Sequence, residues 1–228
     1  MYLNIKHTAM SLTMRNFNIA MVNCKDTLKV INFLEKYYFP HSLLLKYANF
    51  ENTPTVKETL KKFWTIALSQ NISVIITDEN EEVVGLSCNI VVHKQADLYY
   101  GLDGGVQTIN KFLTEVGKEL YKKYEDLEHY FYIVLVAVRD GCGHYNLEKR
   151  LINFSKGVAA DFGVKIIRMD AHNAAEAERA KKIGFNLVYE IKYKDYKDDE
   201  EEVFSRDSQD VFSILSVNSK RCPFSCFT

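Results

Sequence analysis

The sequence has no charge excess of either sign, no paired cysteine motif and no long apolar run. Its 29 lysines and arginines balance 30 aspartates and glutamates, so it lacks the basic excess on which non-specific nucleic-acid binding depends. No run is long enough to span a bilayer, and residues 1–17 lack the continuous apolar core of a signal peptide. We therefore expect no nucleic-acid partner and no membrane partner.

The cysteines point to a reducing compartment. They are odd in number, scattered, and without the CxxC spacing of a zinc site; their positions are Cys24, Cys88, Cys142, Cys222 and Cys226. We expect a cytoplasmic protein that holds no metal.

Nearly half of the 228 residues, 47%, are apolar, which is enough to bury a core in one domain. We expect a single domain over residues 15–218, with loosely ordered ends at 1–14 and 219–228. For the oligomeric state we favour a monomer.

Apolar periodicity predicts an α+β fold of mixed α/β order. The first half contains a strand at 17–23, a helix at 25–39, a helix from Pro54 and an antiparallel hairpin over 72–92. The apolar face of the first helix carries Leu28, Ile31, Leu34 and Tyr38. The second half alternates helices at 107–124, 147–162 and 173–183 with strands at 129–138, 164–171 and 185–196, and a last strand at 210–217 closes the sheet.

The stretch "VAVRDGCGHYNLEKRL", residues 136–151, joins an apolar strand to a helix through a small glycine-containing loop. This layout is typical of a phosphate-binding turn, in which backbone N–H groups point at the anion. Asn146 and Glu148, however, stand at the start of the helix. The residues alone leave open whether the loop binds an anion.

The order of the elements, together with "NAAEAERAKKIGFNLVYEIKYKDYK", resembles the GNAT acyltransferases, and among them the insect arylalkylamine (dopamine-type) N-acetyltransferases. Ten residues separate Asn173 from Gly184-Phe185, a spacing common in that superfamily. Tyr189 and the Asp195-Tyr196 pair match the strand that follows. The resemblance covers about residues 17–218. It implies the GNAT fold, in which a mixed, mainly antiparallel sheet is flanked by helices and two splayed strands form the acyl-CoA cleft.

The resemblance implies acetyl-CoA-dependent N-acetylation of a small arylalkylamine or a related amine, by direct transfer. Acetyl-CoA would then be the co-substrate and a small-molecule amine the partner. The alternative is a GNAT-fold pseudoenzyme, a binding or scaffold protein that has lost acetyl-CoA chemistry.

The resemblance implies that the acyl donor is bound by backbone groups of the strand at Val136 and Val138 and by the loop that follows this strand. The family's Arg/Gln-x-x-Gly-x-Gly/Ala motif falls on Gly143, His144, Tyr145, Asn146, Leu147 and Glu148, and each defining position differs from the motif. One reading is a helix capped by the Asn146 side chain, with Glu148 compensating the helix dipole. The other reading is a loop that still binds CoA, but in an altered way. Asn173 is also assigned to the donor.

For catalysis, His41 falls where the family has a glutamate base, and an unperturbed histidine pKa of about 6.5 suits that task. The alternative is a surface histidine that follows Pro40. His172 and Glu176 stand in the region of the family's serines, although Glu176 also suits a solvated helix face. Ala180 occupies the position of a tyrosine acid in many GNAT enzymes.

The amine site is expected near a cluster of aromatic residues, whose rings suit an arylalkylamine through stacking or cation–π contact. The alternative is that they are core residues. The cluster contains Tyr37, Tyr38, Phe39, Tyr47 and Phe50.

Overall fold

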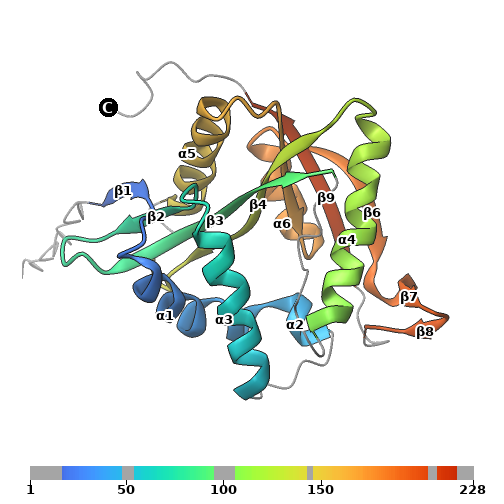
Figure 1. Ribbon diagram of the computed structural model, residues 1–228, viewed down its shortest axis with the longest axis horizontal. Helices are drawn as coiled ribbons and strands as arrows, with labels where there is room; N and C mark the ends of the chain where they lie inside the picture. The colour runs from blue at the N-terminus through green and yellow to red at the C-terminus, as the bar shows by residue number, and fades with distance from the viewer. Residues whose placement is uncertain (1–16, 48–53, 95–105, 143–145, 205–209, 220–228) are drawn as a thin grey trace, which may run out of the picture.

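A computed structural model describes residues 17–47, 54–94, 106–142, 146–204 and 210–219. Their main feature is a seven-stranded sheet (Figure 1). In spatial order the strands are β1 (Asn18–Met21), β2 (Val74–Thr77), β3 (Val83–His93), β4 (His129–Val138), β5 (Ile166–Ala171), β9 (Val211–Asn218) and β6 (Asn186–Lys192). β4 and β5 pair in parallel, and the other neighbouring strands pair antiparallel. The predicted α+β class, with a mixed and mainly antiparallel sheet, is confirmed.

Helices cover both faces of the sheet, each over its own hydrophobic core. One core joins the sheet to the helices α1 (Thr27–Tyr37), α2 (Leu43–Tyr47), α3 (Pro54–Leu68) and α4 (Val106–Lys123). The other joins it to α5 (Leu147–Asp161) and α6 (Ala174–Lys182). The described residues also form four short elements: η1 (Phe39–His41), η3 (Tyr193–Asp195), β7 (Lys197–Asp198) and β8 (Glu201–Glu202). In the described ranges, no helix has the length and apolar character needed to cross a membrane.

The predicted hairpin is formed by β2 and β3. Asp78 makes its turn, because its Oδ1 accepts hydrogen bonds from the backbone N–H of Asn80 at 3.0 Å and of Glu82 at 3.1 Å. Glu81 adopts the left-handed region with φ 59°. Arg139, directly after β4, donates to Asp78 at 3.1 Å and to Glu82 at 3.2 Å. These hydrogen bonds link the hairpin turn to the start of the loop after β4.

Two apolar residues of the predicted helices are exposed, one of them on a face predicted to be buried. Leu28 of α1 is 71% exposed, because the buried face is formed by Val30, Ile31, Phe33 and Leu34. At 3.6 residues per turn, Leu28 lies roughly opposite this face. Phe162 is 57% exposed and lies just beyond the end of α5, at the C-cap.

The last strand lies inside the sheet. β9 pairs with β5 on one side and with β6 on the other, so it separates two strands that a simple β-α-β-α-β order would make neighbours. The strand predicted at 185–196 is shorter than expected and ends at Lys192, where η3 begins. η3 turns the wholly buried Tyr193 into the core.

Candidate active site

A cavity opens where β4 and β5 separate. Their pairing joins Phe131–Ile133 to Ile167–Met169, whereas β4 continues to Val138. This cavity, here called the strand opening, measures about 160 Å³. It is lined by Tyr38, His41, Ser42, Leu43, Ile133, Val134, Leu135, Val136, Glu148, Met169, Asp170, His172, Glu176 and Arg179.

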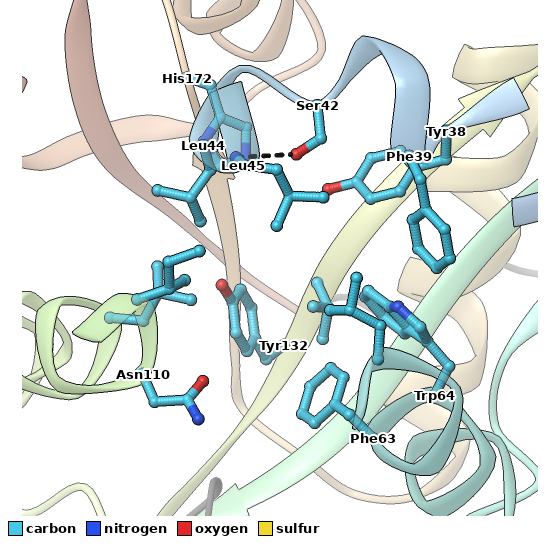
Figure 2. Close-up of a pocket in the computed structure, with 14 residues that line it drawn as sticks. Tyr38, Phe39, Ser42, Leu44, Leu45, Phe63, Trp64, Asn110, Tyr132 and His172 are labelled. Atoms are coloured by element: carbon cyan, nitrogen blue, oxygen red, sulfur yellow. Dashed lines mark hydrogen bonds between the residues drawn. The ribbon is translucent and has the colours of Figure 1, made fainter. Parts of the chain in front are cut away.

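A second cavity, here called the aromatic pocket, adjoins the strand opening and measures about 70 Å³. Figure 2 shows the side chains that surround it, contributed by the α1–η1–α2 segment, α3, α4, β4 and the residue after β5. They are Tyr38, Phe39, Ser42, Leu44, Leu45, Leu60, Phe63, Trp64, Ile109, Asn110, Leu113, Tyr132, Val134 and His172. Among these described residues there is no aspartate or glutamate.

Buried donors distinguish the aromatic pocket from ordinary core. Trp64 is 5% exposed and Asn110 is 7% exposed. Trp64 Nε1 and Asn110 Nδ2 have no hydrogen-bond partner among the described residues. Because an unmet buried donor costs free energy, an acceptor that reached either atom would be stabilising. Of the expected aromatic cluster, Tyr38 and Phe39 line this pocket, while Tyr37 packs against the core. The Tyr47 side chain and Phe50 lie outside the description.

Four residues line both cavities: Tyr38, Ser42, Val134 and His172. Burial raises the pKa of the Tyr38 hydroxyl to about 12, and its hydrogen bond with Ser42 acts in the opposite direction. Ser42 Oγ also accepts from the backbone N–H of Leu45 at 3.5 Å, drawn as a dashed line in Figure 2. At neutral pH, Tyr38 therefore presents a protonated hydroxyl where the cavities meet.

His172 follows β5 directly and is held in a fixed orientation. Its Nδ1 lies 2.9 Å from the Tyr193 hydroxyl, and its ring packs against Phe212 with centroids 5.6 Å apart. Its backbone N–H donates to Glu176 at 2.8 Å. Within the described part of the chain, Nε2 has no hydrogen-bond partner. Nδ1 thus helps to orient the ring, and Nε2 is available for proton transfer.

Asn173 and Glu176 form a capping box at the start of α6. Asn173 Oδ1 accepts from the Glu176 backbone N–H at 2.9 Å, and Asn173 Nδ2 donates to Glu176 Oε1 at 2.9 Å. Glu176 Oε2 accepts the bond from His172 N–H. Both carboxylate oxygens are thus engaged, as in the reciprocal caps that fix helix starts. Glu176 lines the strand opening and helps to hold His172 in position.

His41 lies in η1 next to Pro40 and is exposed. It lines the strand opening but does not line the aromatic pocket. Both histidines considered for catalysis thus reach the strand opening, and His172 also reaches the aromatic pocket.

The loop after β4 leads into α5 without a side-chain cap. Asn146 precedes α5 in the left-handed region, with φ 55° and ψ 30°, and its side chain makes no capping hydrogen bond. Of the two readings that the sequence left open, the helix capped by the Asn146 side chain is therefore not observed, because a side-chain cap normally requires extended backbone at that residue. Gly141 also has positive φ, 80°. Gly143, His144 and Tyr145 lie outside the described residues.

The other residues assigned to the donor fall into different environments. Val136 lines the strand opening, whereas Val138 packs against the core beneath α5. Leu147 is fully buried. Glu148 lines the strand opening and forms an ion pair with Arg179 of α6, with Oε1 and Nε 3.6 Å apart.

A buried ion pair at the wall of the strand opening was not predicted from the sequence. Arg168 donates to Asp170 from Nε at 2.8 Å and from Nη2 at 2.7 Å, and both side chains are 1% exposed. The Tyr132 hydroxyl donates to Asp170 at 2.5 Å. Burial disfavours the charged guanidinium, but the negative charge of Asp170 and its hydrogen bonds outweigh this, so the Arg168 pKa lies well above its usual value. The available signal was the Arg-x-Asp spacing in an apolar strand, which places both side chains on one face.

Arg168 also requires a small residue on α4. Its guanidinium lies 4.4 Å from the centre of the Tyr132 ring. A Cβ atom at Gly117 would come within 2.8 Å of Arg168 Nη1. Gly117 therefore allows the helix to approach the buried cation.

Neither Cys88 nor Cys142 is suited to act as a nucleophile at this site. Cys142 is 2% exposed and belongs to the core beneath α5, as expected for a small loop residue. Cys88 is fully buried, and burial raises its thiol pKa to about 12. Because the thiolate is the nucleophilic form, Cys88 is unsuited to nucleophilic attack at neutral pH.

Comparison with protein-family models gives no match, and comparison with curated protein sequences gives none either. Comparison with solved structures gives strong matches. Arylalkylamine N-acetyltransferase 2 from Aedes aegypti matches with a TM-score of 0.78 and 24% identity, over 90% of this chain and 100% of that chain. A polyamine N-acetyltransferase from Drosophila melanogaster, which forms N-acetylagmatine, matches with a TM-score of 0.75 and 16% identity, over 89% and 100%.

A more distant match has the same architecture. It is a protein from Desulfovibrio desulfuricans described as an acetyltransferase of the GNAT family, with a TM-score of 0.53 and 12% identity, over 90% of this chain and 99% of that chain. The resemblance expected from "NAAEAERAKKIGFNLVYEIKYKDYK" is thus confirmed at the level of the fold. The chain has the GNAT fold, and its structure resembles those of the insect arylalkylamine N-acetyltransferases.

Proposed function

We propose that this protein is an N-acetyltransferase that moves the acetyl group of acetyl-CoA directly to a small arylalkylamine. One observation carries the proposal: the strand opening and the aromatic pocket meet at Tyr38, Ser42, Val134 and His172. A thioester in the first cavity and an amine in the second would come together at these residues. Such contact is what direct transfer between two bound substrates requires.

His172 serves as the general base in this proposal. An amine reaches the site largely as its ammonium ion and must lose a proton before its lone pair attacks the thioester carbonyl. His172 lines both cavities, and the bond from Nδ1 to Tyr193 leaves Nε2 for this proton. His41 remains the second candidate because it also lines the strand opening.

Tyr38 and the open edge of β4 supply the remaining groups. When the tetrahedral intermediate collapses, the C–S bond breaks and the thiolate needs a proton or a hydrogen bond. The Tyr38 hydroxyl, with its pKa raised to about 12, is protonated and lies at the junction. Beyond Ile133, backbone groups of β4 no longer pair with β5 and are suited to bind the thioester oxygen and the pantetheine arm.

The aromatic pocket favours an arylalkylamine over a polyamine. A polyamine brings a second positive charge, and burying that charge without a carboxylate partner is costly. No acidic residue occurs among the described residues that line the pocket. The unpartnered donors of Trp64 and Asn110 instead suit an aromatic ring that carries an acceptor, such as a phenolic oxygen.

The test measures binding and turnover separately. CoA at millimolar concentration is expected to raise the melting temperature, since a ligand that binds the native state stabilises it. Thiol release from acetyl-CoA is then followed with tyramine, phenethylamine, putrescine and agmatine. Release with the two aromatic amines and little with the two polyamines is expected. Faster release with putrescine or agmatine would contradict the substrate assignment.

The alternative is a GNAT-fold protein that has lost acetyl-CoA chemistry. The observation that favours it is the position of Glu148, whose carboxylate lines the strand opening where the family motif has a small residue. No thermal shift with CoA or acetyl-CoA, at concentrations that shift an intact GNAT enzyme, would support this alternative and refute the enzyme.

A further inference from the structure

We propose that Arg179 is the phosphate-binding cation of the strand opening and that Glu148 is its internal competitor. The acyl donor's diphosphate would have to displace Glu148 from Arg179 in order to bind. This inference rests on the proposed function, since it concerns how the same cleft holds its donor.

The charges around the strand opening identify the competing carboxylate. Three carboxylates line it, those of Glu148, Asp170 and Glu176. Asp170 is neutralised by the buried Arg168 and also accepts a bond from Tyr132. One oxygen of Glu176 accepts a hydrogen bond from the backbone N–H of His172, and the other accepts one from the Asn173 side chain. Glu148 instead pairs with the exposed Arg179, so it is the carboxylate that holds the cation a diphosphate would need.

Arg179 is the only lysine or arginine among the described residues that line the strand opening. A guanidinium offers planar, paired N–H donors that match phosphate oxygens. On α6 the neighbouring Ala177 and Ala180 face the core, whereas the Arg179 side chain is 53% exposed. It can therefore reorient towards a ligand without disturbing the packing of the helix.

The contact between Glu148 and Arg179 is easily exchanged. The atoms lie 3.6 Å apart, which is an ion-pair distance beyond normal hydrogen bonding, and the Glu148 side chain is 47% exposed. Exposed pairs of this kind are weak because water screens both charges. A diphosphate, with more negative charge and more acceptor oxygens, would compete effectively for Arg179.

The experiment compares CoA with pantetheine, which has the same thiol arm but lacks the diphosphate and the nucleotide. Calorimetric titration of the full chain uses the wild type, Arg179→Gln, Glu148→Gln and the double variant. Lys182→Gln is the matched control, since it removes an exposed cation from the same helix outside the strand opening.

We expect Arg179→Gln to weaken CoA binding about tenfold and Glu148→Gln to strengthen it about threefold to tenfold, the usual size of the effect of a single charged group on the binding of a charged ligand. Pantetheine binding should stay unchanged in both. In the double variant CoA should bind as in Arg179→Gln within about twofold, because the gain at Glu148 operates through Arg179.

Each other result would overturn the inference. If Arg179→Gln binds CoA as Lys182→Gln does, or if Glu148→Gln gains nothing, the pair does not control the donor. If pantetheine and CoA weaken equally, Arg179 holds the arm and not the phosphates. In these cases pantetheine still binds, so the proposed function stands. If neither ligand binds any variant, the proposed function fails and this inference fails with it.

Discussion

The aromatic pocket and the strand opening share four residues but differ in chemistry. The aromatic pocket is lined by rings and aliphatic side chains, with neutral polar groups and no carboxylate among the described residues. The strand opening contains three carboxylates and one arginine. Under the proposed function, the cavity for the amine is apolar, whereas the cavity for the acyl donor contains a carboxylate, Glu148, that would compete with a diphosphate. Substitutions in and around the two cavities can test that difference.

The largest effect is expected at the buried ion pair of Arg168 and Asp170. Asp170→Ala should lower the free energy of unfolding by about 3–5 kcal/mol, because Arg168 is left buried without a counter-charge. Denaturant unfolding measures this loss. Replacing both partners by Arg168→Met and Asp170→Leu should recover much of it. A loss below about 1 kcal/mol in Asp170→Ala would show that Arg168 finds another partner or water.

Loss of the base should reduce turnover strongly while leaving the fold intact. His172→Ala is expected to lower kcat by about 10²–10⁴-fold, the usual contribution of a general base. His41→Ala is the matched control, and its kcat should stay close to that of the wild type. Thiol release at saturating amine measures both. A larger loss of kcat in His41→Ala than in His172→Ala would identify His41 as the general base.

A smaller and more selective effect is expected in the aromatic pocket. Trp64→Phe keeps a ring but removes the unpartnered Nε1 donor. KM for tyramine should rise about fivefold to tenfold, the value of one hydrogen bond of about 1 kcal/mol. KM for phenethylamine, which lacks the phenolic acceptor, should change little. An equal rise for both amines would assign Trp64 a packing role alone.

The smallest effect is expected at the exposed pair of the strand opening. Glu148→Ala should change the free energy of unfolding by less than about 1 kcal/mol, because both partners are half exposed. Denaturant unfolding beside Asp170→Ala makes the contrast direct. A loss of several kcal/mol would show that the pair supports the fold and would weaken its role as an exchangeable contact.

Local patterns predicted the types of the elements because those patterns follow backbone geometry. The apolar run at 129–138 and the helical spacing from Leu147 both correspond to observed elements, β4 and α5. Such patterns could not predict that β9 lies between β5 and β6, since strand order depends on contacts between distant segments.

The candidate site was predicted in part. The family pattern indicated His172, Asn173 and Glu176, and these residues lie together at the end of β5. Trp64 and Asn110 were not singled out, because they come from α3 and α4 and share a cavity only in the folded chain. Asn146 suited a cap by residue type, but the left-handed backbone that precedes α5 prevents it.

The position of β9 also bears on how the chain folds. β5 ends at Ala171 and β6 at Lys192, yet the strand that joins them does not begin until Val211. Until that segment has left the ribosome, β5 and β6 each have an unpaired edge, which is a site for wrong pairing and aggregation. Because this closure is non-local, it should be a late and slow step of folding. The residue that completes the proposed catalytic geometry, His172, packs against Phe212 of β9, so activity would arise only after that step.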